Sequence, residues 1–548
     1  MERSWWKEGV IYQIYPRSFC DSNNDGIGDL PGIHSKLDYL AQLGIDIIWL
    51  SPVYDSPNAD NGYDIRNYYD IMAEFGTMED FDSLLAGIHE RGMKLVMDLV
   101  VNHTSDEHAW FQEAKSSPTS EKRDYYIWKK GKAGGPPNNW QSFFGGSAWE
   151  YDEASDEYYL HYFAVKQPDL NWENQKVRQE VYSMMKFWLD KGVDGFRMDV
   201  IPLISKRLEY ADTDISDFGK VIERVYANGP RVHEFLQEMN KEVISKYDML
   251  TVGEGVGIIS EMAADYVGKN RGELHMIFHF GHMFLDHGPK GRLDRQEWTL
   301  ETFIGIFEEW DKAMENTGWN SLYLGNHDFP RMVDRFGDAE KYWKASAKLL
   351  AMFLMAYRGT PTIYQGDELG MINVPFTSIE EFDDIELMNA WHEQRQEVGF
   401  DEDHFLAMAR IQGRDNARTP FQWSSESHAG FTSSAPWIKV NPSYQHINAA
   451  QQVEDKDSIL AFYKELLAFR KQWDVLVYGD LTSFPLVDGA LYGFERKKNN
   501  TSLRVVLNFS SLPQKCPQEW IKGSLIFSNY EGEEEEILRP WEGRYYCF

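Results

Sequence analysis

Short apolar runs recur along the chain, and segments with helical periodicity separate them; this alternation constrains the fold more than any other feature. Predicted strands cover residues 10–15, 46–50, 94–99, 195–198, 249–253, 275–278, 321–324 and 362–364. Predicted helices between them include residues 30–43, 78–91, 175–191 and 340–356. Eight strands alternating with helices predict an α/β fold, a (β/α)8 TIM barrel.

Two further domains are predicted from departures in this spacing. A βαβ unit needs roughly 30 residues, and far more chain than that separates the third strand from the fourth. The excess, residues 104–171, is rich in Trp, Tyr, Phe and Gly and lacks helical periodicity, so we expect an inserted domain of irregular β structure. It leaves the barrel after strand 3, so it should overhang the active face. The barrel then covers 1–103 and 172–475, and short alternating strands over 476–548 predict a C-terminal antiparallel β domain, a β-sandwich.

Charge and composition limit the partners. The formal net charge of -32 argues against nucleic acid and anionic membranes, which are polyanions. The 19 Trp and 29 Tyr include flat amphipathic rings that suit the faces of sugars. Three cysteines form no disulfide framework, and neither a signal peptide nor a membrane span is visible. We expect a cytoplasmic monomer or homodimer that binds a neutral ligand.

Acidic side chains follow several predicted strands at the face where barrel enzymes act. Asp199 ends strand 4, Glu254 ends strand 5 and Asp328 follows strand 7. Side chains alternate along a strand, so Arg197 and Asp199 point the same way, and the pairing should depress the pKa of Asp199. An Arg–Asp pair that only fixes packing, and acids that are merely solvated, are the alternatives. Three converging acids suit glycosidic bond chemistry, in which one carboxylate attacks the anomeric carbon and a protonated acid serves the leaving oxygen.

Five motifs in a fixed order carry a family resemblance. They are 98–103 (DLVVNH), 167–171 (QPDLN), 195–200 (GFRMDV), 252–255 (VGEG) and 326–328 (NHD). With them, essentially the whole chain resembles glycoside hydrolase family 13, the α-amylase family, and within it the oligo-1,6-glucosidase and α-glucosidase group. The resemblance implies that Asp199 is the nucleophile, Glu254 the general acid/base and Asp328 the transition-state stabiliser of a retaining enzyme.

The resemblance also implies the residues that bind substrate. Those holding the non-reducing terminal glucose are expected to be Asp60, Tyr63, His103, Arg197, His327 and Arg418, with Phe163 and Gln167 lining the same pocket from the insertion and Glu386 in the neighbouring subsite. Asp60 and Arg418 are expected to pair and block the end of the pocket. Such a block implies exo action on one terminal glucose.

The linkage preference and the reaction outcome leave alternatives open. Val200 after the nucleophile resembles enzymes that prefer α-1,6 linkages, whereas relatives acting on maltose tend to carry Thr there. An α-1,4-preferring α-glucosidase is therefore the alternative. The stretch 292–295 (RLDR) resembles a loop of sucrose-isomerising relatives, so a sucrose isomerase or glucosyltransferase is a further alternative. A non-catalytic glycosidase-like ectodomain needs a membrane anchor and usually a broken acid set, and the sequence shows neither.

A polar loop after strand 1 matches a metal site. Oxygen donors recur at Asp21, Asn23, Asp25, Asp29 and the carbonyl of Ile27, with Gly26 at the sixth position, a spacing typical of a Ca2+ loop. Position 12 is Gly32 rather than Glu, so the loop is no true EF-hand, and a plain polar turn is the alternative. We expect a structural Ca2+, with Mg2+ possible and no organic cofactor.

Overall fold

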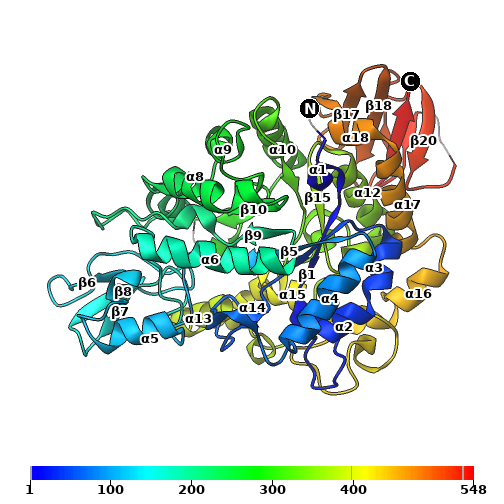
Figure 1. Cartoon of the computed structure of the whole chain (residues 1–548). Coiled ribbons are helices and arrows are strands. Elements are labelled where there is room, and N and C mark those ends of the chain that lie inside the picture. The colour runs from blue at the N-terminus through cyan, green and yellow to red at the C-terminus, as the bar shows by residue number, and fades with distance from the viewer. Residues whose placement is uncertain (1–2, 290, 397, 533–535) are drawn as a thin grey trace.

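The computed structural model describes residues 3–289, 291–396, 398–532 and 536–548, and its centre is an eight-stranded parallel sheet. The strands run in the order β11-β10-β9-β5-β2-β1-β15-β14, and β11 and β14 are in contact, which closes the sheet into a barrel (Figure 1). The bounds are β1 Ile11–Ile14, β2 Ile47–Leu50, β5 Lys94–Leu99, β9 Gly195–Met198, β10 Leu250–Gly255, β11 Met276–His279, β14 Ser321–Leu322 and β15 Thr360–Tyr364. All eight predicted strands, and the barrel, are confirmed.

Helices surround the barrel, and capping residues mark where several of them begin and end. They include α2 Leu30–Ser35, α3 Leu37–Leu43, α4 Met78–Glu90, α6 Gln175–Lys191, α8 Val232–Glu242, α10 Leu300–Met314 and α12 Trp343–Ala356. Thr77 forms a capping box with Asp80 at the start of α4, and Gly192 ends α6 in the left-handed conformation. The prediction of one helix over 30–43 is wrong, because Lys36 leaves helical geometry (φ -107°, ψ 6°) and divides it.

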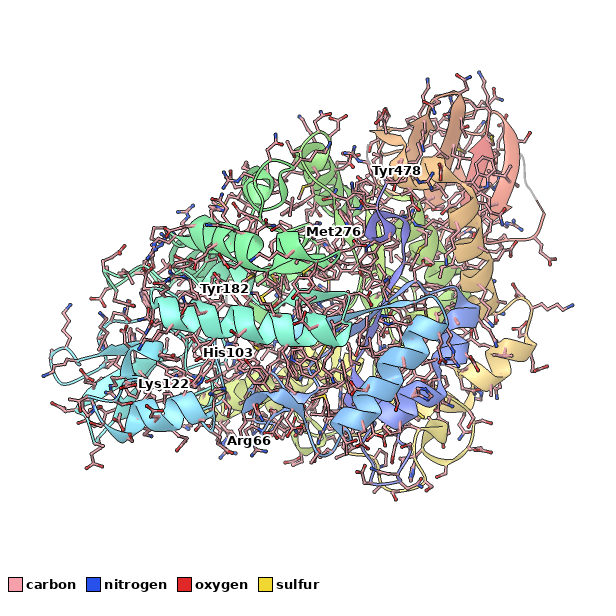
Figure 2. The ribbon with its side chains drawn as sticks, in the orientation of Figure 1. Arg66, His103, Lys122, Tyr182, Met276 and Tyr478 are labelled. Atoms are coloured by element: carbon pink, nitrogen blue, oxygen red, sulfur yellow. The ribbon has the colours of Figure 1, made fainter. Side chains whose placement is uncertain are left out.

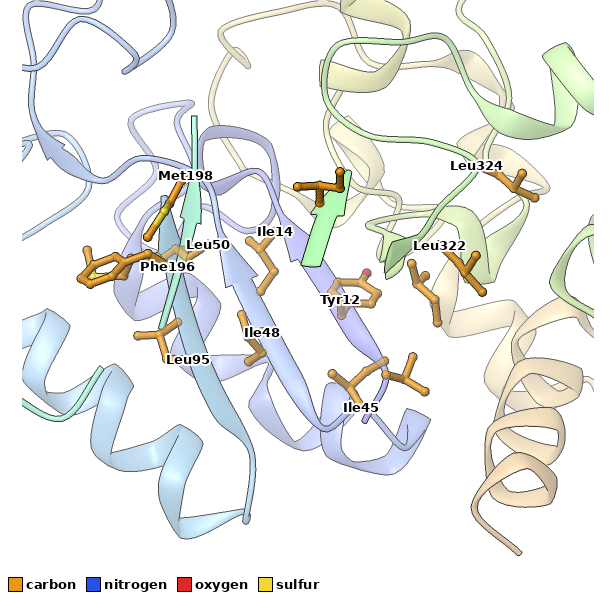
Figure 3. Close-up of a cluster of buried hydrophobic side chains, with 14 of the residues drawn as sticks. Tyr12, Ile14, Ile45, Ile48, Leu50, Leu95, Phe196, Met198, Leu322 and Leu324 are labelled. Atoms are coloured by element: carbon orange, nitrogen blue, oxygen red, sulfur yellow. The ribbon is translucent and has the colours of Figure 1, made fainter. Parts of the chain in front are cut away.

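Side chains along the barrel strands point alternately outward and inward, so the strands contribute to two hydrophobic cores. Tyr12, Ile48 and Phe196 point outward and pack under the helices, in the cluster that Figure 3 shows. Ile11 and Ile47, one residue earlier on β1 and β2, point inward and fill the barrel together with Trp49, Val96, Leu250, Val252, Met276 and Phe278. The inward positions on the same strands also include the polar site residues, so the period of two along each strand places them in the barrel mouth.

The insertion between β5 and α6 builds a separate small sheet. Strands β6 Trp128–Lys129, β8 Glu157–Leu160 and β7 Trp149–Asp152 pair antiparallel, and they lie at the opposite end of the molecule from the C-terminal sheet (Figure 1). The predicted β character is confirmed, but the prediction that the insertion lacks helix is wrong. Helix α5 Ala109–Ser116 buries Phe111 and Ala114 against the insertion's aromatic residues.

The segment after β15 returns to the barrel mouth before the chain enters the C-terminal domain. It carries α13 Ile385–Gln394, α14 Glu402–Gln412 and α15 Asp415–Arg418. The C-terminal antiparallel sheet has the order β16-β17-β18-β22-β20, with bounds Asp480–Ser483, Leu491–Lys498, Thr501–Asn508, Gly543–Cys547 and Ser524–Ser528. Among the described residues, no helix is both long enough and apolar enough to cross a bilayer.

Candidate active site

A cavity of about 810 Å³ opens at the carboxyl ends of the barrel strands, between the insertion and the segment after β15. Ten of the twelve predicted catalytic and substrate-binding residues line it: Asp60, Tyr63, His103, Phe163, Asp199, Glu254, His327, Asp328, Glu386 and Arg418. Arg197 and Gln167 lie directly behind the lining, where they bond to lining residues. His103, labelled in Figure 2, is buried, and its backbone pairs with Asp169 of the insertion.

One guanidinium organises the carboxylates at the base of the cavity. Arg197 Nη1 lies 2.7 Å from Asp199 Oδ1 and 2.6 Å from Asp98 Oδ1, and Nη2 lies 2.8 Å from Glu254 Oε1. The second oxygen of Glu254 accepts the backbone N–H of Val200 at 2.8 Å. Val200 adopts a left-handed backbone (φ 35°, ψ 38°), a strained state for a β-branched residue, and this turn aims its N–H at Glu254. Asp199 and Glu254 are therefore held side by side.

The charge balance at Arg197 corrects one prediction. Burial raises the pKa of Asp199 well above its ordinary value, the neighbouring Glu254 raises it further, and Arg197 only partly opposes them. The expectation that Arg197 depresses the pKa of Asp199 is therefore wrong, because three buried carboxylates share one cation. Burial also raises the pKa of Glu254, which favours the protonated form that a general acid needs.

Asp328 sits in the opposite electrostatic environment. Arg418 Nη2 lies 2.9 Å and Arg414 Nη1 3.5 Å from its Oδ1, and His327 Nε2 lies 3.2 Å from its Oδ2. Burial alone would raise the pKa of Asp328, but His327 and these guanidinium groups hold it well below its ordinary value. Asp328 is thus a permanent anion, suited to stabilise positive charge on a sugar ring.

The predicted pair between Asp60 and Arg418 is not formed. Arg418 bonds to Asp328 and to the carbonyl of His327, whereas Asp60 Oδ2 accepts the amide of Gln167 at 3.0 Å. Burial raises the pKa of Asp60 to about 7, so this carboxyl competes weakly for a cation that the ionised Asp328 already holds. Both residues still line the cavity.

Aromatic rings and histidines complete the inner wall. The ring of Tyr63 stacks on His327 at 5.2 Å with the planes 3° apart, and its hydroxyl donates to Asp98 at 3.1 Å. His103 contacts Gln167 at 3.3 Å and packs against Phe163, with ring centroids 5.2 Å apart. These residues, excluding Phe163, are buried, so the inner end of the cavity is a wall of fixed side chains.

The comparisons with known proteins agree with this geometry. The model of the α-amylase catalytic domain matches residues 13–479. The chain belongs to the α-amylase family. The chain is 55% identical to an oligo-1,6-glucosidase of Parageobacillus thermoglucosidasius, over 100% of the chain and 99% of that relative. It is 53% identical to an oligo-1,6-glucosidase of Bacillus cereus, over 99% of each. Among solved structures, isomaltulose synthase SmuA from Protaminobacter rubrum superposes with a TM-score of 0.96 at 45% identity, with both chains covered fully. The present chain is thus a glycoside hydrolase by family.

Several lining residues of this α-amylase-family chain were missed in the sequence. Arg414 bonds Asp384 and Asp328, and Arg292 bonds Glu386 at 3.1 Å and the carbonyl of Asp328 at 3.0 Å. Many of the other missed side chains are apolar: Phe143, Phe144, Phe218, Ile222, Val256, Phe280, Phe284 and Phe329. Val256 could have been found two residues beyond Glu254, but the others come from the insertion and from the segments that follow the barrel strands, whose path the sequence pattern does not indicate.

The predicted metal loop has a backbone geometry that fits its spacing. The side chains of Asp21, Asn23 and Asp25 each accept the N–H two residues later, at 3.0, 2.9 and 2.9 Å, which curls the loop around their oxygens. Asp21 also accepts the N–H of Gly26 at 2.9 Å. Asp29 instead caps α2 and bonds Ser22. Within the described chain, no cluster of three His, Cys, Asp or Glu side chains is arranged to hold a metal ion.

Proposed function

We propose that the protein is a retaining, exo-acting α-glucosidase that removes the non-reducing terminal glucose of short α-glucosides and favours α-1,6 linkages. One observation carries the proposal. Asp199 and Glu254 are held on the two terminal nitrogens of one guanidinium, beside the permanently ionised Asp328, at the walled inner end of a sugar-sized cavity.

The roles follow the family resemblance, and the positions of the three carboxyl groups agree with them. An oxygen of Asp199 attacks the anomeric carbon, the glycosidic C–O bond breaks, and Glu254 gives its proton to the leaving oxygen. Asp328 stabilises the positive charge that develops on the ring. Glu254, now ionised, then takes a proton from water, whose oxygen attacks the same carbon and releases Asp199. Two displacements retain the α configuration.

The linkage preference rests on relatives and on one lining residue. Named oligo-1,6-glucosidases at 50–55% identity support it, and Val200 lines the cavity directly after the nucleophile. The test is a panel of isomaltose, maltose, sucrose and trehalose with proton NMR of the first product. We expect kcat/KM to be highest for isomaltose and α-glucose to appear first. Initial release of β-glucose would overturn the mechanism, and a preference for maltose would overturn the linkage.

Sucrose isomerisation is the second candidate, and a specific observation favours it. The loop containing Arg292 and Leu293 lines the cavity mouth, and isomaltulose synthases superpose on the chain with TM-scores of 0.96 to 0.97. An isomerase keeps fructose in the outer subsite and converts sucrose into a new disaccharide, whereas a hydrolase releases two monosaccharides. Chromatography of the products from sucrose separates the two functions.

The charge of the mouth favours neutral sugars over phosphorylated ones. A trehalose-6-phosphate hydrolase of Bacillus subtilis is 46% identical over 99% of the chain. Of the described residues at the rim, Asp217, Glu386 and Glu393 are acidic, and the cation Arg292 is already paired with Glu386. A phosphate would meet net negative charge there, so we expect trehalose-6-phosphate to be a poorer substrate than trehalose.

We further propose that Asp21, Asn23, Asp25 and Asp29, with the carbonyl of Ile27, hold a structural Ca2+. The loop curled around the side-chain oxygens of Asp21, Asn23 and Asp25 supports it, since hard cations take oxygen donors. When bound, the ion would tie the loop together and take no part in the chemistry. Removing it with a chelator should lower the melting temperature while initial rates at 25 °C change little, and added Ca2+ should restore the melting temperature. Loss of turnover at unchanged melting temperature would contradict a structural ion.

A cytoplasmic location is also proposed. Cys20 and Cys516 are buried free thiols and Cys547 is a half-buried one, which suits a reducing compartment. Whether the protein is a monomer or a homodimer stays a prediction for size-exclusion chromatography with light scattering.

A further inference from the structure

The ring of His327 is fixed on every side. It stacks on Tyr63 and on Tyr15, at 5.2 and 5.9 Å between centroids, and Trp49 meets it edge-on at 6.3 Å. Its Nε2 lies 3.2 Å from Asp328 Oδ2 and its Nδ1 lies 2.8 Å from the amide nitrogen of Gln13. The side chain is 1% exposed, and these contacts define the plane of the ring and the neighbour of each nitrogen.

The partner of Nε2 settles which nitrogen carries the hydrogen. Asp328 is held as an anion by Arg418 and Arg414, so its oxygen can only accept. Two acceptors 3.2 Å apart would repel, and Nε2 must therefore donate. Burial lowers the pKa of His327 to about 3, and Arg197, Arg418 and Arg414 also disfavour its charged form, although Asp328 favours it. A neutral ring with hydrogen on Nε2 leaves a lone pair on Nδ1.

Gln13 supplies the donor that this lone pair needs. Gln13 lies two residues after Ile11 on β1, so its side chain also points into the barrel. It is fully buried. Its amide nitrogen faces His327 Nδ1 at 2.8 Å and Ser51 Oγ at 3.2 Å, so both amide hydrogens point at acceptors. The amide oxygen has no partner among the described residues. A buried amide with an unpaired oxygen is costly, and packing alone would be served better by an apolar residue.

We propose that Gln13 is a positioning residue that fixes His327 as the neutral tautomer with its hydrogen on Nε2, directed at Asp328 and the sugar. Its effect on turnover rests on the proposed glucosidase function, whereas the tautomer does not. The amide holds the imidazole with its N–H on the side of the cavity, where Nε2 lies 3.2 Å from Asp328 Oδ2 and attracts that carboxylate. The residue acts from β1, on the far side of the histidine from the substrate.

The experiment reads the tautomer directly. Full-length protein labelled with ring-15N histidine gives long-range proton–nitrogen spectra that distinguish protonated from unprotonated ring nitrogens, and His327→Asn identifies the signal among the 15 histidines. We expect wild-type His327 to carry hydrogen on Nε2 alone at pH 7. Gln13→Glu places an acceptor at Nδ1, so the ring should gain a second hydrogen. Ser51→Ala removes the other partner of Gln13 and is the matched control; it should keep the wild-type spectrum.

Kinetics supply the second readout. Gln13→Met, which matches the length of glutamine and lacks the donor, should lower kcat on isomaltose roughly ten-fold with little change in KM. Ser51→Ala should stay within about two-fold of wild type. A wild-type spectrum with hydrogen on Nδ1, or an unchanged spectrum in Gln13→Glu, would overturn the proposal, as would wild-type kcat in Gln13→Met. If the wild-type spectrum is as expected but no α-glucoside is cleaved, the proposed function fails and the tautomer stands.

Discussion

Neutralising the two reacting carboxyl groups should move the stability of the protein in opposite directions. Asp199→Asn removes one negative charge from a cluster in which Asp98, Asp199 and Glu254 share the single cation of Arg197. Only Oδ1 of Asp199 is bonded there, and the carbonyl oxygen of an asparagine can keep that bond while its NH2 faces the cavity. The substitution therefore removes repulsion and loses no hydrogen bond.

Glu254→Gln lacks this freedom, because both oxygens of Glu254 accept. One faces Arg197 at 2.8 Å and the other the N–H of Val200 at 2.8 Å, so the NH2 of a glutamine must meet one of two donors. Forcing a donor against a buried donor costs about 1–3 kcal/mol. For Asp199, burial and the neighbouring Glu254 raise the folded pKa, so the ionised carboxyl destabilises the folded protein at neutral pH, and asparagine should make it more stable.

Differential scanning calorimetry at pH 7 measures both changes. With an unfolding entropy of about 2.1 cal/mol/K per residue over 548 residues, 1 kcal/mol corresponds to ~1 °C in melting temperature. We expect Asp199→Asn to melt above wild type and Glu254→Gln below it, while both lose several orders of magnitude in kcat. Asp38→Asn, at an exposed surface pair, is the control and should not shift. A lower melting temperature for Asp199→Asn, or an unchanged one for Glu254→Gln, would refute the charge balance described above.

Three further substitutions test the electrostatics of buried charges at the cavity and behind it. The pKa of Asp60 is raised to about 7, so the folded state binds a proton that the unfolded state releases, and wild-type stability should fall as pH rises from about 4 to about 7. Relative to wild type, Asp60→Asn should become more stable over that window by on the order of 2–4 kcal/mol, seen in urea unfolding at several pH values; a difference independent of pH would contradict it. Lys206 Nζ bonds Asp169 Oδ2 and Asn102 Oδ1, both at 2.6 Å, and Asp169 is fully buried. Lys206→Met should therefore cost about 3–5 kcal/mol, and adding Asp169→Asn should recover much of it; equal losses in the single and double variants would refute the pairing.

The barrel could be predicted from the sequence because its strands are short, apolar and buried on both faces. Parallel strands of this kind stand out as continuous runs, and even β14, which pairs over only Ser321–Leu322, lies within the short run 321–324 that was predicted as a strand. Once the strands were located, the position of Asp199 and Glu254 at their carboxyl ends followed. The division of the first predicted helix at Lys36 could not be predicted, because the apolar period continues through the break.

The electrostatics of the site depend on distances between segments far apart in the chain. Alternation predicted correctly that Arg197 and Asp199 share a side, and they lie 2.7 Å apart. The sign of the pKa shift was predicted wrongly, because Asp98 and Glu254 reach the same guanidinium from β5 and β10. Whether Arg418 bonds Asp60 or Asp328 likewise depends on the path of the loops after β15. Those loops have no hydrophobic periodicity from which their path could be predicted.

The barrel's interior explains why an excess of negative charge persists in this place. Along β1 and β10 the inward positions change from apolar at the floor to polar at the mouth: Ile11 precedes Gln13 on β1, and Val252 precedes Glu254 on β10. The apolar floor excludes solvent from beneath the carboxylates, so their repulsion is not screened, and burial together with this repulsion raises the pKa values of Asp199 and Glu254. A raised pKa favours the protonated form that a general acid at Glu254 needs. The same burial that destabilises the folded chain therefore prepares Glu254 for its role, and relieving it at Asp199 should gain stability only at the expense of turnover.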